Sequence, residues 1–282
     1  MNIFQLIKSV LDWEFDQIEA PSRERRISLI NNRHSELTLA YGDLTDDNRV
    51  RPSYSDPATR FAYIYKYTTC HADIVYSCIR SYKELARLFD GDGWIKIACI
   101  GGGPGSDLIG VLKYALLQNK TKSIKCFLLD KESAWGDTWS DIEEHSDDLP
   151  FRLSTHFQAL DVTDATTWSA QTKYHSANLF TFVYFLSEIY RYDAESRSFF
   201  KELVERAESG AYFLFIENDA AEFIAQIQRF YDDYGLTVVG SSSLTYQTDT
   251  NEEKTDLNPY YDELRDSPKI RARIYKALMV KP

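Results

Sequence analysis

The sequence predicts an α/β fold, an open parallel sheet with helices on both faces, joined to a helical N-terminal extension. Two observations carry this prediction. From residue 94 onward, apolar runs of strand length alternate with segments whose apolar residues recur at helical spacing, a pattern typical of parallel sheets with crossover helices. Before that point, helical spacing dominates on both sides of one loop. We therefore expect a helical extension over residues 1–92 and a sheet domain over residues 93–282.

The extension divides at a loop over residues 42–58, which is rich in Gly, Asp, Asn, Pro and Ser. On both sides of this loop, apolar residues three and four positions apart predict helices. These helices are expected at 4–15, around 27–30, at 61–68 and at 74–88, with the last one ending near residues 91–93.

The sheet domain is expected to contain seven strands. They are predicted at 95–100, 125–130, 156–161, 179–186, 211–217, 236–241 and 275–281. Helical patterns lie between them at 108–117, 135–144, 194–207 and 220–234, with a short turn near 165–169. A long insertion, residues 242–273, precedes the last strand.

Composition restricts the classes of protein that fit. Hydrophobic residues make up 44% of the 282 residues and aromatic residues 14%, which excludes a disordered chain. No apolar run approaches the ~18 residues of a membrane helix, the N-terminus lacks the pattern of a signal peptide, and the four cysteines show no C-x-x-C spacing. We therefore expect a soluble intracellular protein of the cytoplasm or nucleus, without a membrane partner.

Charge and histidine placement exclude further classes. The net charge of −11 argues against broad electrostatic capture of nucleic acid. Arginine clusters in the first sixty residues leave room for a local basic groove, although a solvated helix face of mixed charge is the favoured explanation. The five histidines show no H-x-x-x-H or His/Cys grouping, so we expect no metal site.

The most informative segment covers residues 95–117 and predicts a buried strand, a turn and an amphipathic helix in succession. Four glycines lie in the turn: Gly101, Gly102, Gly103 and Gly105. Without Cβ atoms the backbone can pass close under a ligand, and the free amides of the following helix face that ligand. Proteins of the α/β class hold nucleotide-like cofactors in this way, at the carboxyl edge of a parallel sheet.

The glycine spacing discriminates between cofactors. A dinucleotide-binding G-x-G-x-x-G motif fails because the sixth position counted from Gly101 is Ser106, and no P-loop is present. The pattern is G-x-G-x-G, and here the chain resembles the class I, Rossmann-like S-adenosylmethionine (SAM)-dependent methyltransferases. The resemblance implies SAM as the cofactor, bound along the four glycines, and a mostly parallel sheet whose last strand is antiparallel. The chain departs from the family at Cys99, where an acidic residue is usual.

Two further strand ends carry acidic residues in register with this motif. Asp130 ends the second predicted strand, and its carboxylate can accept hydrogen bonds from two ribose hydroxyls. Asp161 and Val162 follow the third strand. The resemblance implies that Asp130 holds the ribose of SAM, and that Asp161 and the amide of Val162 bind the adenine. Helix capping is the alternative, by Asp130 for the segment after it and by Asp161 or Thr163 for a short helix.

The fourth predicted strand leads into Ser187, Glu188 and Tyr190. In the resembled family this strand tip lies beside the methyl sulfonium, so we take Ser187 as a cofactor contact and Glu188 and Tyr190 as candidate catalytic residues. Glu188 could act as a general base, orient a substrate amine, bind the methionine end of SAM or cap the next helix. After strand five, residues 217–219 could contact substrate, although a helix start is favoured.

Aromatic residues ahead of the sheet domain are further candidates. Four tyrosines are interleaved with two cations there: Tyr54, Tyr63, Tyr65 and Tyr67 with Arg60 and Lys66. They could stack on a planar substrate or close over the cofactor, although aromatics at helical spacing are more often core. Trp135 and Trp139 could border the adenine pocket.

The sequence therefore predicts a SAM-dependent methyltransferase that transfers a methyl group to an O or N acceptor. RNA, a protein and a small molecule all remain open as the acceptor. In the resembled family, helical extensions usually cover the substrate or close over the cofactor, and this one could also bind a protein partner. The alternative is a catalytically silent methyltransferase-like fold that acts as a partner-binding subunit. The glycine spacing disfavours a nicotinamide or flavin enzyme.

Overall fold

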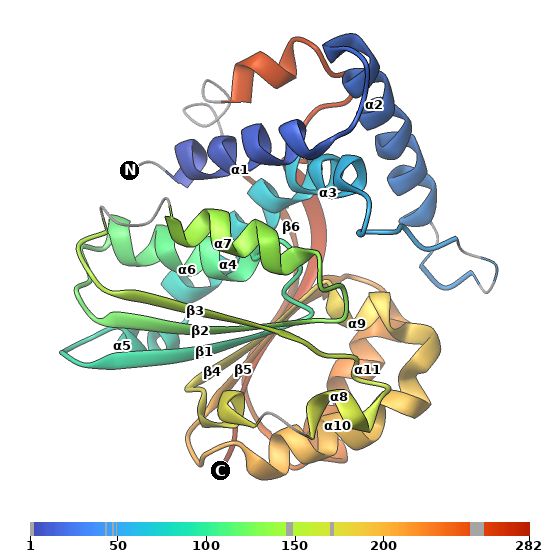
Figure 1. Cartoon of the computed structure of the whole chain (residues 1–282). Helices are drawn as coiled ribbons and strands as arrows, with labels where there is room; N and C mark the ends of the chain where they lie inside the picture. The colour runs from blue at the N-terminus through green and yellow to red at the C-terminus, as the bar shows by residue number, and fades with distance from the viewer. Residues whose placement is uncertain are drawn as a thin grey trace.

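The computed structural model describes residues 3–42, 44–46, 48, 50–144, 149–169, 172–248 and 257–282. At its centre is a seven-stranded sheet with the order β3-β2-β1-β4-β5-β7-β6 (Figure 1). The strands are β1 (Trp94–Ile100), β2 (Ser123–Asp130), β3 (Leu153–Ala159), β4 (Leu179–Val183), β5 (Tyr212–Asn218), β6 (Thr237–Gln247) and β7 (Arg271–Val280). β1 to β5 pair in parallel, and β7 lies antiparallel between β5 and β6. The predicted mostly parallel, seven-stranded fold is confirmed.

Helices cover both faces of the sheet (Figure 1). One face carries α6 (Ser106–Leu117) and α7 (Trp135–Glu144), and the other carries α8 (Ala165–Trp168), α10 (Asp193–Arg206) and α11 (Ala221–Asp232). Along β1, Ile95, Ile97 and Cys99 belong to the core of the first face, whereas Ala98 and Ile100 belong to that of the second. Successive side chains of a strand point to opposite faces, so a strand buried on both faces must be apolar throughout.

The N-terminal extension packs on the face that carries α6 and α7. It consists of α1 (Ile3–Gln17), α2 (Arg23–Ala40), α3 (Pro57–Tyr63), a π-helical turn (Ile64–Thr68), α4 (Thr69–Ser81) and α5 (Lys83–Leu88). One apolar core, with members from Leu6 to Leu278, includes residues of both the extension and the sheet. α4 approaches α6 so closely that a Cβ atom on Gly110 would lie 2.4 Å from the carbonyl oxygen of Ala72. The division into two domains at residue 92 stays a prediction.

Two helix boundaries in the extension differ from the prediction. Helical backbone is continuous from Pro57 to Ser81 through the π-helical turn, where the sequence predicts two helices. The second of these ends at Ser81, because Tyr82 has extended backbone angles (φ −95°, ψ 109°). The Tyr82 hydroxyl donates to the carbonyl of Gly240, 3.4 Å away on β6. Packing against the sheet edge thus overrides the helical spacing at this point.

The insertion predicted at 242–273 is shorter than expected. β6 continues to Gln247 and β7 begins at Arg271, so both ends of the predicted insertion pair as antiparallel strands. The residues of this edge strand, β6, are mostly polar and exposed, so a search for apolar runs does not detect its full length. Residues 249–256 lie outside the described part of the chain. Residues 257–270 pack on the extension, where the hydroxyl of Tyr260 donates to Asp12 Oδ1 at 2.5 Å.

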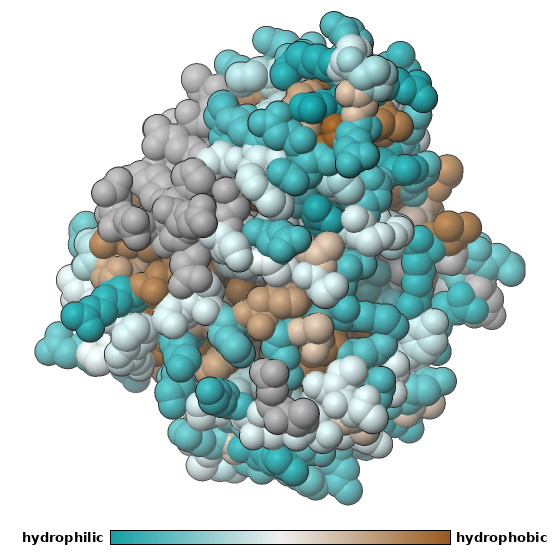
Figure 2. All heavy atoms as spheres, viewed as in Figure 1, coloured by the Kyte–Doolittle hydropathy of each residue, from teal (hydrophilic) through white to brown (hydrophobic). Residues whose placement is uncertain are grey.

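The surface seen in Figure 2 is mostly hydrophilic, with apolar residues gathered near the middle of the view. Within the described ranges, no helix combines the length and the apolar character needed to cross a bilayer.

Candidate functional site

A cavity of about 640 Å³ opens at the carboxyl ends of β1, β2 and β4. The strand order reverses direction between β1 and β4, because the chain continues to β2 on one side of β1 and reaches β4 on the other. Ligands of open α/β sheets bind at such a switch point, and small-molecule sites have volumes of roughly 300–1,000 Å³. Position and size therefore make this cavity the candidate site.

The glycine loop forms part of the cavity wall. Gly101, Gly102 and Gly103 line it, whereas Gly105 is covered by Trp139 and does not. A Cβ atom on Gly101 (φ +66°) would lie 1.9 Å from the Phe185 ring, and one on Gly105 (φ +76°) would lie 1.3 Å from the Trp139 ring. The close approach expected of a ligand is thus made at these two positions by the protein's own aromatic rings. At Gly103 the nearest atom would be 3.7 Å away.

Asp130 projects from the end of β2 into the wall of this cavity. Its Oδ2 accepts from the amide of Gly103 and its Oδ1 from the amide of Glu132, both at 2.9 Å. Burial raises the pKa of Asp130 to about 6, and the two amide hydrogen bonds oppose part of that rise. Because a carboxylate has about four acceptor positions, two remain for hydroxyl donors of a ligand. Asp130 also caps the turn at Glu132, so the capping and ligand-binding roles are compatible.

Asp161 and Val162 follow β3 and line the same cavity. The carboxylate of Asp161 accepts from Lys131 Nζ at 2.6 Å and from the amide and hydroxyl of Thr163. Burial raises the pKa of Asp161, but these hydrogen bonds outweigh it, and the net shift is downward. Asp161 does not cap the following helix, α8. The N-cap of α8 is Asp164, whose carboxylate accepts from the amide of Thr166. The capping alternative for Asp161 is therefore wrong.

The tip of β4 brings only part of the predicted catalytic group into the cavity. Tyr184 has a left-handed backbone (φ 53°) and leads into the short helix α9 (Phe185–Glu188). Glu188 lines the cavity. Ser187 is buried beside it, with its amide donating to Glu217 Oε2 at 3.0 Å. Tyr190 turns away and packs edge-on against Phe223 of α11, so it is not among the lining residues.

Glu217 and Asp219, at the end of β5, form hydrogen bonds that hold neighbouring segments of the fold. Glu217 is buried, its pKa is raised to about 7 by burial, and it accepts from the amides of Ser187 and Asn218. Asp219 bonds Ser243 and Arg273 instead of starting a helix. Helix α11 begins at Ala221 with Ala220 as its N-cap. The favoured interpretation as a helix start is thus wrong, because Asn218 bonds Glu217 and Asp219 bonds partners on β6 and β7.

Sequence reasoning missed Asp107, which lies in the first turn of α6 and lines the cavity. The hydroxyl of Thr181 donates to its carboxylate, and Thr181 is the cross-strand partner of Cys99. A carboxylate therefore lies beside Cys99, although residue 99 itself is not acidic. Burial raises the pKa of Asp107 to about 7. Its signal in the sequence is the single acidic residue of a mostly apolar helix.

The extension closes the cavity with aromatic rings. Tyr54 and Tyr63 line it together with Tyr41 and Trp135. The rings of Trp135 and Tyr54 are 5.2 Å apart, and those of Tyr54 and Tyr63 are 5.4 Å apart. Burial raises the pKa values of Tyr41, Tyr54 and Tyr63 well above the usual value, so these hydroxyls stay protonated. Tyr65 points elsewhere, with its hydroxyl donating to the carbonyl of Asp266.

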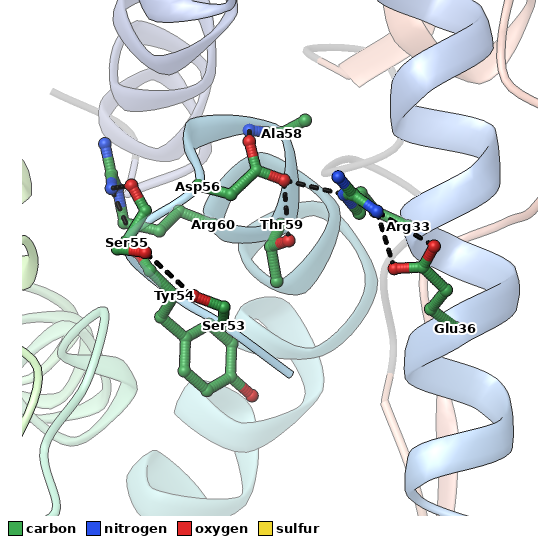
Figure 3. A network of polar contacts seen from close by, with 9 residues as sticks. All are labelled: Arg33, Glu36, Ser53, Tyr54, Ser55, Asp56, Ala58, Thr59 and Arg60. Atoms are coloured by element: carbon green, nitrogen blue, oxygen red, sulfur yellow. Dashed lines mark hydrogen bonds and ion pairs between the residues drawn. The ribbon is translucent and has the colours of Figure 1, made fainter. Parts of the chain in front are cut away.

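Arg60 holds the loop that presents Tyr54 (Figure 3). Its guanidinium donates to the carbonyls of Tyr54 at 3.0 Å and Ser55 at 3.2 Å, and it pairs with buried Glu14 at 2.9 Å. Asp56 caps α3 next to this loop by accepting from the amide of Ala58. Arg60 therefore acts as a buried support. It is not among the residues that line the cavity.

Trp139, like Arg60, supports the site from outside. Its indole Nε1 donates to the carbonyl of Gly103 at 3.0 Å, and only Trp135 of the pair lines the cavity. Within the described ranges, no group of three or more His, Cys, Asp or Glu side chains could hold a metal ion.

The comparisons with known proteins concern the fold. No protein-family model matches the chain, and no curated protein does. Solved structures with a similar fold include a methyltransferase from Pyrococcus furiosus, with 9% identity, a TM-score of 0.45, and coverage of 89% of this chain and 98% of that one. A precorrin-6y C5,15-methyltransferase from Geobacter metallireducens has 11% identity, a TM-score of 0.40, and coverage of 84% and 96%. An rRNA methylase from Streptococcus thermophilus has 12% identity, a TM-score of 0.39, and coverage of 72% and 94%.

At these identities the likeness is one of fold alone. The mostly parallel sheet and its antiparallel last strand, β7, are those that the resemblance implied. The chain has a Rossmann-like α/β fold, with a seven-stranded, mostly parallel sheet between two layers of helices.

Proposed function

We propose that the protein transfers a methyl group from SAM to an oxygen or nitrogen atom of an acceptor, with SAM bound in the cavity at the strand ends. One observation carries the proposal: the glycine loop, Asp130 and the pair Asp161–Val162 come from the ends of three strands and line one cavity. The three strands are neighbours in the sheet, in the order β3-β2-β1.

The buried carboxylates support a cationic ligand. Neither Asp107 nor Asp130 forms an ion pair with a Lys or Arg side chain of the described residues, and burial raises the pKa of both. Buried charges normally have a partner. A ligand with positive groups would provide one, and it would lower both pKa values.

Each residue has a defined task in this proposal. SAM supplies a methyl group on a positively charged sulfur, which leaves readily. Asp130 accepts from the ribose hydroxyls, and Asp161 with the amide of Val162 binds the adenine. The rings of Tyr41, Tyr54 and Tyr63 exclude water and present aromatic faces to a cation. Glu188 lies where it can hold the acceptor's proton.

The test is calorimetric titration of SAM into the wild-type protein and into Asp130→Asn. We expect micromolar-range binding to the wild type and at least about tenfold weaker binding to the variant, because a hydrogen bond to a charged group contributes ~1.5–3 kcal/mol. The matched control is Asp164→Asn, which also removes a carboxylate near the cavity. Asparagine caps helices as well as aspartate does, so this control should bind SAM normally.

Turnover is then measured with labelled SAM and acceptors of each class. Failure of the folded wild type to bind SAM would refute the proposal and favour the silent, partner-binding alternative. Equal SAM affinity in Asp130→Asn and the wild type would refute the role of Asp130 alone.

A further inference from the structure

A second chamber of about 250 Å³ adjoins the cofactor cavity under the extension. Both spaces share Tyr41, Tyr63, His71, Tyr184 and Glu188 as lining residues, so they meet along this set. A cavity of about 150 Å³ accommodates benzene. The second chamber therefore has room for one substituted ring and is too small for a bulky ligand.

Much of the wall of the second chamber is aromatic. Tyr67 lies 5.1 Å from Tyr63 and 5.5 Å from Tyr41, measured between ring centroids. His71 stacks on Tyr184 at 4.2 Å. Burial lowers the pKa of His71 well below its usual value, so this ring is neutral near pH 7. Such walls favour a flat, apolar body between them.

This aromatic chamber also contains a cation from the segment before β7. Lys269 lines it, and Lys269 Nζ lies 5.8 Å from the ring centroid of Tyr67 and 5.6 Å from that of Tyr184. No carboxylate of the described residues forms an ion pair with it. Lys66, which also lines the chamber, differs because Asp266 pairs with it.

Glu188 is a carboxylate at the boundary between the two spaces. The Tyr41 hydroxyl is hydrogen-bonded to its carboxylate. The second chamber thus carries a positive group from the C-terminal segment and a negative one beside the cofactor cavity.

We propose that the second chamber binds the methyl acceptor, a planar molecule of one ring whose carboxylate pairs with Lys269 and whose hydroxyl or amino group faces Glu188. This inference rests on the proposed function. The acceptor's oxygen or nitrogen forms the new bond to the methyl carbon. The carbon–sulfur bond breaks with its electron pair left on sulfur, and the acceptor's proton passes to Glu188. An acceptor with a cation in place of the carboxylate is disfavoured, because it would face Lys269.

The experiment separates cofactor binding from acceptor binding. S-adenosylhomocysteine is first titrated into each protein alone. Salicylate, para-hydroxybenzoate and anthranilate are then titrated into the saturated complex, each beside its neutral carboxamide. For at least one pair we expect the wild type to bind the acid about tenfold or more tightly than the amide, and Lys269→Met to bind both about equally. Lys269→Arg should keep part of the preference.

Lys201→Met, which removes an exposed lysine of α10, is the matched control and should behave as the wild type. Melting curves of all variants check that they fold. If the wild type binds no S-adenosylhomocysteine, the proposed function fails before the acceptor is tested.

Three results overturn the acceptor proposal while leaving the proposed function intact. One is cofactor binding without binding of any acid in the panel. Another is a loss of S-adenosylhomocysteine affinity in Lys269→Met with the acid preference unchanged, which would assign Lys269 to the carboxylate of the cofactor's methionine end. The third is methylation of RNA or protein by a wild type that methylates none of the panel compounds.

Discussion

The floor and the roof of the cofactor cavity are built in different ways. The floor consists of Gly101–Gly103, Asp130, Asp161 and Val162, all at strand ends within about sixty residues of chain. The roof consists of Tyr41, Tyr54 and Tyr63, which belong to the extension. Floor residues are oriented by short turns, as when Asp130 accepts from two nearby backbone amides. Roof residues are held by contacts between distant segments.

Glu14 shows what those distant contacts involve. This buried residue of α1 accepts from Arg60 of α3 and from Thr138 of α7, so one carboxylate joins three helices. The floor thus depends on local backbone geometry, whereas the roof depends on burial. Three substitutions test this difference.

Gly105→Ala should have the largest effect, because it distorts the loop that carries the floor residues Gly101–Gly103. Its Cβ atom would lie 1.3 Å from Trp139, whose indole is held on the Gly103 carbonyl, and the backbone is left-handed (φ +76°). We expect a loss of more than ~5 kcal/mol in the free energy of unfolding, measured by urea denaturation.

Gly91→Ala is the matched control for that variant. Gly91 has the same φ of +76°, but its Cβ atom would meet nothing within 4 Å. The free energy of unfolding of Gly91→Ala should fall by only about 1–2 kcal/mol, because alanine is strained in a left-handed backbone. Equal losses in both variants would mean that Trp139 does not constrain the loop.

Arg60→Met should have the next largest effect, because it breaks the roof. The side chains of Arg60 and Glu14 are 6% and 0% exposed, and removal of one partner from a buried ion pair costs ~3–5 kcal/mol. Denaturation curves measure the loss. Adding Glu14→Gln to Arg60→Met should recover part of it by removing the unpaired charge. Arg26→Met, which breaks the exposed pair with Asp16, should cost less than about 1 kcal/mol.

Asp107→Asn should change how stability depends on pH. The folded protein raises the pKa of Asp107 from 3.8 to about 7, so the folded state holds this proton more tightly than the unfolded state does. The contribution of this proton to the free energy of unfolding is complete below about pH 4 and is lost as the pH rises toward 7. As the pH rises across this range, the free energy of unfolding of the variant should therefore fall by about 1 kcal/mol less per pH unit than that of the wild type.

Unfolding free energies at half-unit pH intervals measure this slope. Asp164→Asn, which removes the exposed carboxylate that caps α8, should keep the wild-type slope. Identical slopes in wild type and Asp107→Asn would contradict the burial of a protonated carboxyl group beside Cys99.

The acceptor experiment adds a contrast in binding. Asp130→Asn, a floor variant, should weaken binding of SAM. Lys269→Met should alter the binding of acidic acceptors and leave that of S-adenosylhomocysteine unchanged. If Asp130→Asn and Lys269→Met both weakened binding of the same ligand, the cavity floor and the second chamber would not have separate binding roles.

Helix capping and strand-end geometry explain which sequence predictions were wrong. The pattern at Asp164-x-Thr166 and the one at Asp161-x-Thr163 look alike in sequence, and only the backbone path decides that Asp164 caps α8. Tyr190 lies two residues beyond Glu188, yet the turn after α9 directs it to Phe223. One residue of difference in a turn redirects a side chain, and spacing alone does not report that.

The alternation of strands and helices, the glycine loop and the acidic strand ends could all be predicted from the sequence. These follow from local rules: strand periodicity, the need for glycine at positive φ and the short turns after parallel strands. Only the tertiary structure decided that Trp139 covers Gly105, that Asp107 lies beside Cys99 and that Lys269 lines the chamber beneath Tyr41. Such contacts join residues far apart in the chain through packing, and packing depends on the volume and shape of all neighbours at once.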